Sequence, residues 1–320
     1  MSHISDLYAK LDENIHKVIV GKDETIKLLF ISLLCGGHIL IEDVPGTGKT
    51  KLVKSFAASL DCDCKRIQFT PDLLPSDITG INFYNMKRSD FELIKGPIFG
   101  NVVLADEINR ATPKTQSGLL ECMEERQATI DGTRYPLPDV FMIIATQNPL
   151  ENMGTFPLPE AQIDRFFIKC RMEYPTTDES VDILDRFNRC DPLDSLQPVA
   201  TQDDVRAACA ELNDVFIHKD LLHYITTLVE ATRKYPSVVL GASPRGGLAL
   251  MRAAKCMAAI EGRNYVLPDD VKKVAVPTLA HRLMLTSSAK LKLNAANEVI
   301  ADIVEKTAVP TETMFDGIYQ

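Results

Sequence analysis

Residues 39–53, ILIEDVPGTGKTKLV, contain the residue types that bind phosphate. Gly46 and Gly48 allow backbone N–H groups to turn towards phosphate oxygens, and Lys49 and Thr50 follow directly. In such a loop the lysine ammonium reaches the terminal phosphates and the hydroxyl is a ligand of Mg²⁺. The residues expected to contact a nucleotide here are Val44, Pro45, Gly46, Thr47, Gly48, Lys49, Thr50 and Lys51.

The strict form of this pattern has a glycine five residues before Gly48, where this chain has Asp43. That position lies where the preceding strand ends, and aspartate tolerates unusual backbone angles better than most residues. Its side chain can also accept a hydrogen bond from a neighbouring N–H. We therefore expect the loop to bind a nucleotide, less tightly than a version with glycine because of the added negative charge.

An acidic pair follows a second apolar run. Residues 102–105 are apolar and end in Asp106 and Glu107. A carboxylate at the end of the adjacent strand completes the Mg²⁺ shell begun by Thr50, which predicts a metal site from Thr50 and Asp106. Glu107 is then the candidate general base that polarises an attacking water. An acidic pair alone is a common way to end a strand, but the lysine loop upstream favours the catalytic interpretation.

Short apolar runs alternate with helical patterns up to about residue 175. The runs are residues 39–41, 66–69, 102–105, 141–145 and 166–170. This alternation predicts an α/β fold, a parallel sheet with helices on both faces. Beyond residue 175 the pattern becomes that of amphipathic helices, at residues 178–187, 201–212, 219–234, 243–260 and 268–283. We expect a nucleotide-binding domain at 1–175 and a smaller helical domain at 176–320.

Composition excludes several classes of protein. The 320-residue chain has a net charge of −9, which argues against a general nucleic-acid binder. The longest apolar run, residues 28–35, is too short to span a bilayer, and no signal peptide is apparent. The 8 cysteines show no pair of metal-binding motifs, which favours reduced thiols. We expect a cytoplasmic protein without membrane insertion and without a nucleic-acid partner.

Three long motifs resemble those of the MoxR family of AAA+ ATPases. They are FTPDLLPSDITG (residues 69–80), GPIFGNVVLADEINRATPKTQSGLLECMEE (96–125) and ATQNPLENMGTFPLPEAQIDRF (145–166). The resemblance extends from residue 18 to the C-terminal helices, and Asp43 is its main departure, since the family usually has glycine there. It implies an AAA+ P-loop domain followed by an all-α lid, with ATP or ADP and Mg²⁺ as cofactors.

The resemblance also implies roles for residues outside the loop. Val20 and Gly21 match the segment that lines the adenine. Asn148 matches sensor 1, a polar side chain near the γ-phosphate, although Asn before proline is also a common turn residue. Arg245, in GASPRG, matches sensor 2 at the start of a lid helix.

Arg165, in PEAQIDRF, matches the arginine finger that completes the site of a neighbouring subunit. An arginine is always ionised and forked, which suits the charge of a phosphoryl transition state. Without the motif, an ion pair with Glu160 or Asp164 on the surface is the simpler interpretation. The finger implies a homo-oligomer, and the family implies a ring, expected to be a hexamer.

Two further segments resemble insertions of the AAA+ group that includes magnesium chelatase subunits and replicative helicases. Residues 126–138 alternate around Asp131 and Gly132, which predicts a β-hairpin. Residues 80–99 stand between two core elements, as an insertion into the second helix does. In that group the insertions face a central pore or a partner; the simpler alternative is two exposed hairpins without a special role.

Three functions are consistent with these features. The first is a MoxR-type ATPase that remodels, activates or assembles protein partners, typically proteins with von Willebrand factor A domains. The second is a chelatase-like motor subunit that drives metal insertion into a tetrapyrrole. The third is a nucleic-acid translocase, which the acidic composition disfavours. The motifs at 69–80 and 107–116 favour the first over the second.

Overall fold

The computed structural model of the protein describes residues 2–44, 46–148, 154–188, 190–292 and 294–310. The chain forms two compact units. The core unit comprises residues 9–166 and 170–206, and the lid unit comprises residues 1–8, 167–169 and 207–320.

A five-stranded sheet with the strand order β2-β5-β8-β1-β9 forms the centre of the core unit. The strands are β1 (Ile39–Asp43), β2 (Cys64–Gln68), β5 (Val102–Asp106), β8 (Met142–Gln147) and β9 (Ile168–Met172). The pairs β1–β8, β2–β5 and β5–β8 are all parallel, and the register places Gln68 beside Asp106. Parallel strands end at the same edge of a sheet, so residues that follow β1, β2, β5 and β8 come together there. The predicted α/β fold is confirmed.

The central strands are buried because helices cover both faces of the sheet. All residues of β5 are buried, as expected for an apolar run in a parallel sheet. One face of the sheet packs against the apolar side of α5 (Pro113–Glu125), where Val103 and Ile143 join a core with Leu119 and Leu120. On β2 and β5 the sheet also contacts α3 (Lys49–Ser59), which starts from the phosphate loop.

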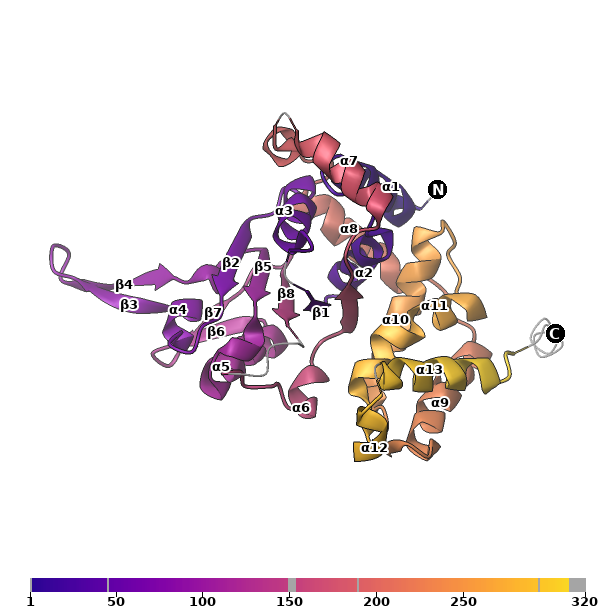
Figure 1. The fold of residues 1–320 in the computed structure, drawn as a ribbon. Helices are drawn as coiled ribbons and strands as arrows, with labels where there is room; N and C mark the ends of the chain where they lie inside the picture. The colour runs from indigo at the N-terminus through magenta and orange to yellow at the C-terminus, as the bar shows by residue number, and fades with distance from the viewer. Residues whose placement is uncertain (1, 45, 149–153, 189, 293, 311–320) are drawn as a thin grey trace. The chain divides into compact units, whose positions relative to one another are not determined.

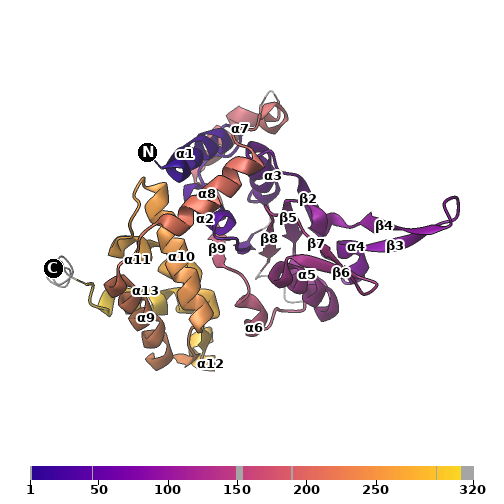
Figure 2. The ribbon, with the colours of Figure 1, turned by 180° about the vertical axis from the view of Figure 1, so that it is seen from behind.

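Two antiparallel hairpins extend from the core unit. The hairpin of β6 (Gln127–Ile130) and β7 (Thr133–Pro136) turns at Asp131 and Gly132, which both have positive φ, as a type I′ turn requires. The hairpin predicted at these residues is confirmed. The second hairpin, β3 (Gly80–Asn85) with β4 (Asp90–Lys95), is a long ribbon that projects away from the sheet (Figures 1 and 2).

The lid unit consists mainly of helices. Its long helices are α9 (Lys219–Lys234), α10 (Pro244–Ile260), α11 (Pro268–Leu279) and α13 (Ala295–Lys306). It also contains a short antiparallel pair, β10 (Val238–Leu240) and β11 (Met284–Leu285), which the apolar pattern did not predict. The helix predicted at 268–283 ends earlier, at Leu279, and continues as a 3-10 turn at Ala280–Arg282. Pro277 lacks an N–H for the helical ladder, which explains why the last turn tightens.

The other helices complete both units. They are α1 (His3–His16), α2 (Asp23–Leu34), α4 (Pro75–Thr79), α6 (Glu160–Ile163), α7 (Thr177–Phe187), α8 (Gln202–Asp214) and α12 (Ser287–Lys290), with 3-10 turns at Pro97–Phe99, Ile108–Arg110 and Pro192–Ser195. The helices predicted at 178–187, 201–212, 219–234 and 243–260 are confirmed within two residues. Among the described residues, none of the helices is both long and apolar enough to cross a membrane.

Candidate nucleotide site

The phosphate loop joins the end of β1 to the start of α3. Gly46 and Gly48 both have a φ of +87°, a left-handed conformation that other residues rarely adopt. A Cβ at either glycine would meet no atom within 4 Å, so the space beside these backbone amides is open. Since α3 begins at Lys49, the amide groups of its first turn point out of the end of the helix, where they can bind an anion. Pro45 and the side chain of Asp43 lie outside the described residues.

Lys49 and Asp106 link this loop to the neighbouring strand. The Lys49 Nζ lies 3.1 Å from the Asp106 Oδ1, and the Asp106 side chain is only 3% exposed. The Thr146 hydroxyl on β8 donates to the same oxygen at 2.7 Å, and Arg66 on β2 donates to the Asp106 Oδ2 at 2.7 Å. The buried carboxylate is therefore hydrogen-bonded from three directions.

These contacts keep the Asp106 carboxyl ionised. Burial raises its pKa, but hydrogen bonds from Thr146, Arg66 and Lys49 and the charge of Lys49 outweigh that effect and hold the pKa below its usual value. An ionised carboxylate and a hydroxyl are the ligands that Mg²⁺ prefers. Thr50, on the first turn of α3, supplies the hydroxyl, so the chemistry of the donors fits the predicted metal.

Glu107 follows Asp106 in a conformation unusual for its residue type. Its backbone is left-handed, with φ at +59°, and its amide donates to the Thr146 hydroxyl at 2.9 Å. Its carboxylate accepts a hydrogen bond from the Gln68 Nε2 at 2.7 Å and lies 3.2 Å from the Arg110 Nε. A non-glycine residue in this region costs of order 1–3 kcal/mol, and such strain often marks a functional position. The local backbone thus directs this carboxylate out of the strand.

Asn148 lies at the same edge of the sheet, directly after β8, and is 8% exposed. Its carbonyl accepts a hydrogen bond from the Asn109 side chain at 3.5 Å. The loop that follows, residues 149–153, lies outside the described residues. The structure therefore brings the loop glycines, Lys49, Asp106, Glu107 and Asn148 to one edge, as the order of the strands predicts.

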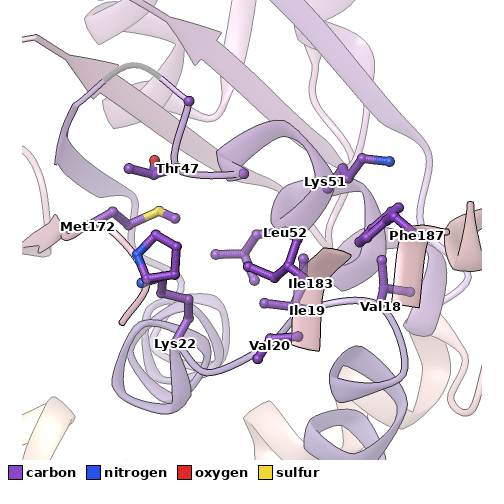
Figure 3. A pocket seen from close by; sticks show the side chains of 13 residues that line it. Val18, Ile19, Val20, Lys22, Thr47, Lys51, Leu52, Met172, Ile183 and Phe187 are labelled. Carbon is purple, nitrogen blue, oxygen red and sulfur yellow. The ribbon is translucent and has the colours of Figure 1, made fainter. Parts of the chain in front are cut away.

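A cavity of about 280 Å³ opens beside the phosphate loop. Its lining is mostly apolar: Val18, Ile19, Val20, Lys22, Gly46, Thr47, Gly48, Lys51, Leu52, Met172, Pro175, Ile183 and Phe187. Figure 3 shows these side chains around the space that the loop borders. An apolar slot next to a phosphate-binding loop has the chemistry for a planar base.

The backbone amide and carbonyl of Val20, at one wall of the cavity, can form hydrogen bonds with such a base. Within the described part of the chain, the amide and carbonyl of Val20 have no hydrogen-bond partner. The segment before Val20 is held by Arg186, which donates to the carbonyls of His16 and Ile19, the latter at 3.1 Å. The described lining includes Val20 but not Gly21. Gly21 has another reason to be glycine.

Gly21 has a φ of +64°, and a Cβ there would lie 2.1 Å from the Glu179 Oε1. Glu179 belongs to a capping box that starts α7, in which the Thr176 amide donates to the Glu179 Oε2 at 2.7 Å. Because α7 supplies Ile183 and Phe187 to the cavity, the glycine allows the approach of a helix that forms its wall.

Lys51, which was expected to contact the nucleotide, contacts two residues of a later segment of the chain. Its Nζ forms an ion pair with Asp191 and lies 4.5 Å from the centre of the Phe187 ring. The hydrogen bond from Lys51 is the main cause that lowers the pKa of Asp191. Lys51 also lines the cavity beside the phosphate loop (Figure 3).

The two remaining predicted residues belong to other elements. Arg165 follows α6 and forms an ion pair with Glu124 on α5, its Nε 3.2 Å from the Glu124 Oε2. The simpler interpretation of Arg165 as an ion-pair residue is thus supported, with Glu124 as a partner that was not considered. Arg245 lies in the first turn of α10, in the lid unit.

Several residues of the site were not predicted. Those around the acidic pair are Arg66, Gln68, Arg110 and Thr146, and those around the cavity are Val18, Ile19, Lys22, Leu52, Met172, Pro175, Ile183 and Phe187. One feature of the sequence could have identified Arg66 and Gln68, because polar residues two apart at the end of a strand face the same side of the sheet. No sequence pattern indicates that α7 lines the cavity beside the phosphate loop.

A buried parallel sheet with this strand order, a glycine loop before α3 and an acidic pair after β5 define a P-loop ATPase of the AAA class. The chain belongs to the MoxR family of AAA+ ATPases. Residues 38–168 match the model described as the ATPase family associated with various cellular activities (AAA), and residues 230–305 match an AAA lid domain.

Named relatives support this assignment. Chaperone MoxR1 of Mycobacterium tuberculosis is 42% identical, over 86% of this chain and 75% of its own length. The uncharacterized protein YeaC of Bacillus subtilis is 49% identical, over 91% of this chain and 92% of its own. A crystal structure of a candidate ATPase from Cytophaga hutchinsonii, 40% identical, covers 96% of both chains with a TM-score of 0.90.

Proposed function

We propose that this protein hydrolyses ATP to ADP and phosphate in an oligomer and uses the energy to remodel, activate or assemble protein partners. The observation that carries the proposal is the cluster at one edge of the sheet, where the Lys49–Asp106 pair adjoins the open loop amides and Glu107. The division into a nucleotide-binding domain at 1–175 and a helical lid at 176–320 belongs to the same proposal.

The position of each residue around the phosphate loop indicates its role in nucleotide binding. The amides of the loop and of the first turn of α3 hold the phosphates, and Lys49 moves its ammonium from Asp106 towards the terminal phosphates. The base enters the apolar cavity, with Val20 offering its amide and carbonyl to the base edge. Thr50 and Asp106 would hold Mg²⁺, which supplies charge neutralisation between the phosphates when bound.

The hydrolytic roles belong to the carboxylate and amide next to the metal ligands. Glu107 accepts a proton from the attacking water, and its backbone, fixed by Thr146, keeps the carboxylate outside the strand. Asn148 orients that water from the end of β8. Preorganised groups of this kind reduce the reorganisation needed in the transition state.

Arg165 and Arg245 act between subunits and between units in this proposal. Arg165 exchanges its ion pair with Glu124 for the γ-phosphate of a neighbouring subunit's nucleotide. Arg245 connects the nucleotide state to the lid from the start of α10. An arginine finger that contacts the nucleotide of a neighbouring subunit requires a homo-oligomer. We propose that this homo-oligomer is a closed hexameric ring in the cytoplasm.

The surface of the β3–β4 ribbon suits the binding of protein clients. Phe83, Met86, Phe91 and Ile94 are 53%, 86%, 66% and 53% exposed, an unusual run of apolar side chains for a protein surface. The family suggests proteins with von Willebrand factor A domains as clients.

Phosphate release by the purified protein tests the proposal. With ATP and Mg²⁺ we expect turnover whose specific rate rises with protein concentration, because each site needs a neighbour. A specific rate that does not change over two orders of magnitude in concentration would contradict the oligomeric part. Co-purification on a Glu107→Gln variant, with ATP bound and clients retained, then identifies the partners by mass spectrometry.

A further inference from the structure

Two side chains of β2 connect the acidic pair of the site. The Arg66 guanidinium donates through its Nη2 to the Asp106 Oδ2 and to the Gln68 Oε1, both at 2.7 Å. The Gln68 Nε2 then donates to the Glu107 Oε2, also at 2.7 Å. Asp106 and Glu107 are therefore joined by a continuous chain of hydrogen bonds that runs through Arg66 and Gln68.

Arg66 determines which way the Gln68 amide faces. An amide has one oxygen that accepts and one nitrogen that donates. Because the Oε1 is turned towards the Arg66 guanidinium, the Nε2 is turned towards the Glu107 carboxylate. When Arg66 moves away, the Oε1 loses its donor, and the amide is less firmly held against Glu107.

Arg66 also occupies one oxygen of the carboxylate that is proposed as a metal ligand. Asp106 already carries the Lys49 ammonium on its Oδ1, so Arg66 is a second cation on one carboxylate. A divalent cation held at Asp106 would be repelled by both. Nucleotide phosphates can attract Lys49, but Arg66 has to leave the Oδ2 or share it.

We propose, on the basis of the proposed function, that Arg66 competes with the divalent cation for Asp106, and that Gln68, as the second acceptor of Arg66, helps to keep it on the Asp106 Oδ2. Withdrawal of Arg66 from the Oδ2 removes the donor from the Gln68 Oε1. Arg66 thus raises the concentration of divalent cation at which the site at Asp106 fills.

Metal-dependent nucleotide binding tests this without any turnover. A fluorescent ADP analogue is titrated with Mg²⁺ at fixed protein, and the half-saturating Mg²⁺ concentration is measured. Arg66→Ala should lower that concentration roughly two- to fivefold, the range of a partly exposed ion pair, since Arg66 is 49% exposed. An unchanged or raised value would overturn the proposal, and a gain in metal affinity cannot arise from damage to the fold.

The same strand offers a matched control. Lys65, next to Arg66, has the same 49% exposure and pairs with Asp63 at 3.1 Å instead of with Asp106. Lys65→Ala should leave the half-saturating Mg²⁺ concentration unchanged. Arg66→Gln, which removes the charge but keeps a polar side chain of similar length, should lower it as Arg66→Ala does. A shift produced by Lys65→Ala as well would show a general charge effect and overturn the assignment to Arg66.

A double-mutant cycle tests the connection through Gln68. Gln68→Ala removes the second acceptor of Arg66, so withdrawal of Arg66 becomes easier and the half-saturating Mg²⁺ concentration falls, less than in Arg66→Ala. In the Arg66→Ala background, Gln68→Ala should have no further effect. Independent, multiplicative effects would show that Gln68 does not act through Arg66.

The two proposals fail in different ways. If the wild-type protein does not bind the ADP analogue at any Mg²⁺ concentration, the proposed function is wrong. If it binds with a normal Mg²⁺ response that Arg66→Ala does not alter, only the role of Arg66 is wrong.

Discussion

Lys49 and Asp106 form an ion pair, with the Nζ 3.1 Å from the Oδ1, at the place where the phosphate loop meets the end of β5. The pair shields the buried Asp106 carboxylate and holds the lysine beside the loop amides. A nucleotide offers Lys49 a more highly charged partner, so the ammonium can exchange Asp106 for phosphate without leaving the site.

Lys49→Ala should weaken nucleotide binding because it removes the charge that reaches the phosphates. We expect a loss of roughly ten- to a hundredfold in affinity for ADP, equivalent to about 1.5–3 kcal/mol for hydrogen bonds to a charged group. Titration with a fluorescent ADP analogue measures it. Lys54→Ala, on the exposed side of the same helix, is the control and should bind as the wild type does. Equal losses in both variants would contradict the role of Lys49.

Phe187→Ala should weaken binding of the base and leave binding of the phosphates unchanged, because the Phe187 ring lines the apolar cavity. We expect ADP affinity to fall roughly three- to tenfold, the effect of lost apolar contact, while inhibition by tripolyphosphate stays the same. Leu184→Ala, on α7 at a side chain that is 74% exposed, is the matched control. Equal weakening of ADP and tripolyphosphate would place Phe187 outside the base site.

Arg165→Ala and Lys49→Ala subunits should complement each other when mixed. Each variant alone lacks turnover, since one removes the finger and the other the nucleotide. In a mixed ring, some interfaces pair an intact loop with an intact finger, so phosphate release should return at intermediate ratios. If subunits exchange and no ratio restores turnover, Arg165 has only its structural pairing with Glu124.

His38 should make stability depend on pH. Its Nδ1 accepts from the Ile143 amide at 3.0 Å, its Nε2 donates to the Met123 carbonyl at 3.1 Å, and burial lowers its pKa to about 4. Below about pH 6.5 the unfolded chain binds a proton that the folded chain excludes, so stability falls between pH 6.5 and about 4, by up to roughly 3 kcal/mol.

Chemical denaturation at pH 7, 6 and 5 measures this slope, in a range where most carboxylates stay ionised. In the His38→Gln variant the decline between pH 6.5 and 5 should become smaller. The same slope in both proteins would show that another group controls stability there.

The sequence predicted the sheet because buried parallel strands are continuous apolar runs. The run at 102–105 became β5 and the run at 141–145 became β8, and the polar residues after each met at one edge. The proximity of Lys49, Asp106 and Glu107 could be predicted for the same reason, because residues that follow neighbouring parallel strands lie close together.

The rest depended on side-chain contacts that no local pattern contains. Lys51 was expected to contact the nucleotide, and its contacts with Asp191 and Phe187, which come from a distant segment, could not be predicted. Arg66 and Gln68 became neighbours of the acidic pair only through the pairing of β2 with β5. The end of α11 was misjudged because Pro277 tightens a helix whose apolar pattern continues.

We propose that different residues of one site carry the binding and the hydrolysis of ATP. The most direct measurement compares, for Glu107→Gln and wild type, the affinity for a fluorescent ATP analogue and the single-turnover rate of ATP hydrolysis. We predict that the affinity stays within about threefold while the rate falls by roughly two orders of magnitude or more, the scale of a lost general base. Glu121→Gln, at an exposed residue of α5, should match the wild type in both. Equal loss of affinity and rate in Glu107→Gln, or an unchanged rate, would contradict the claim.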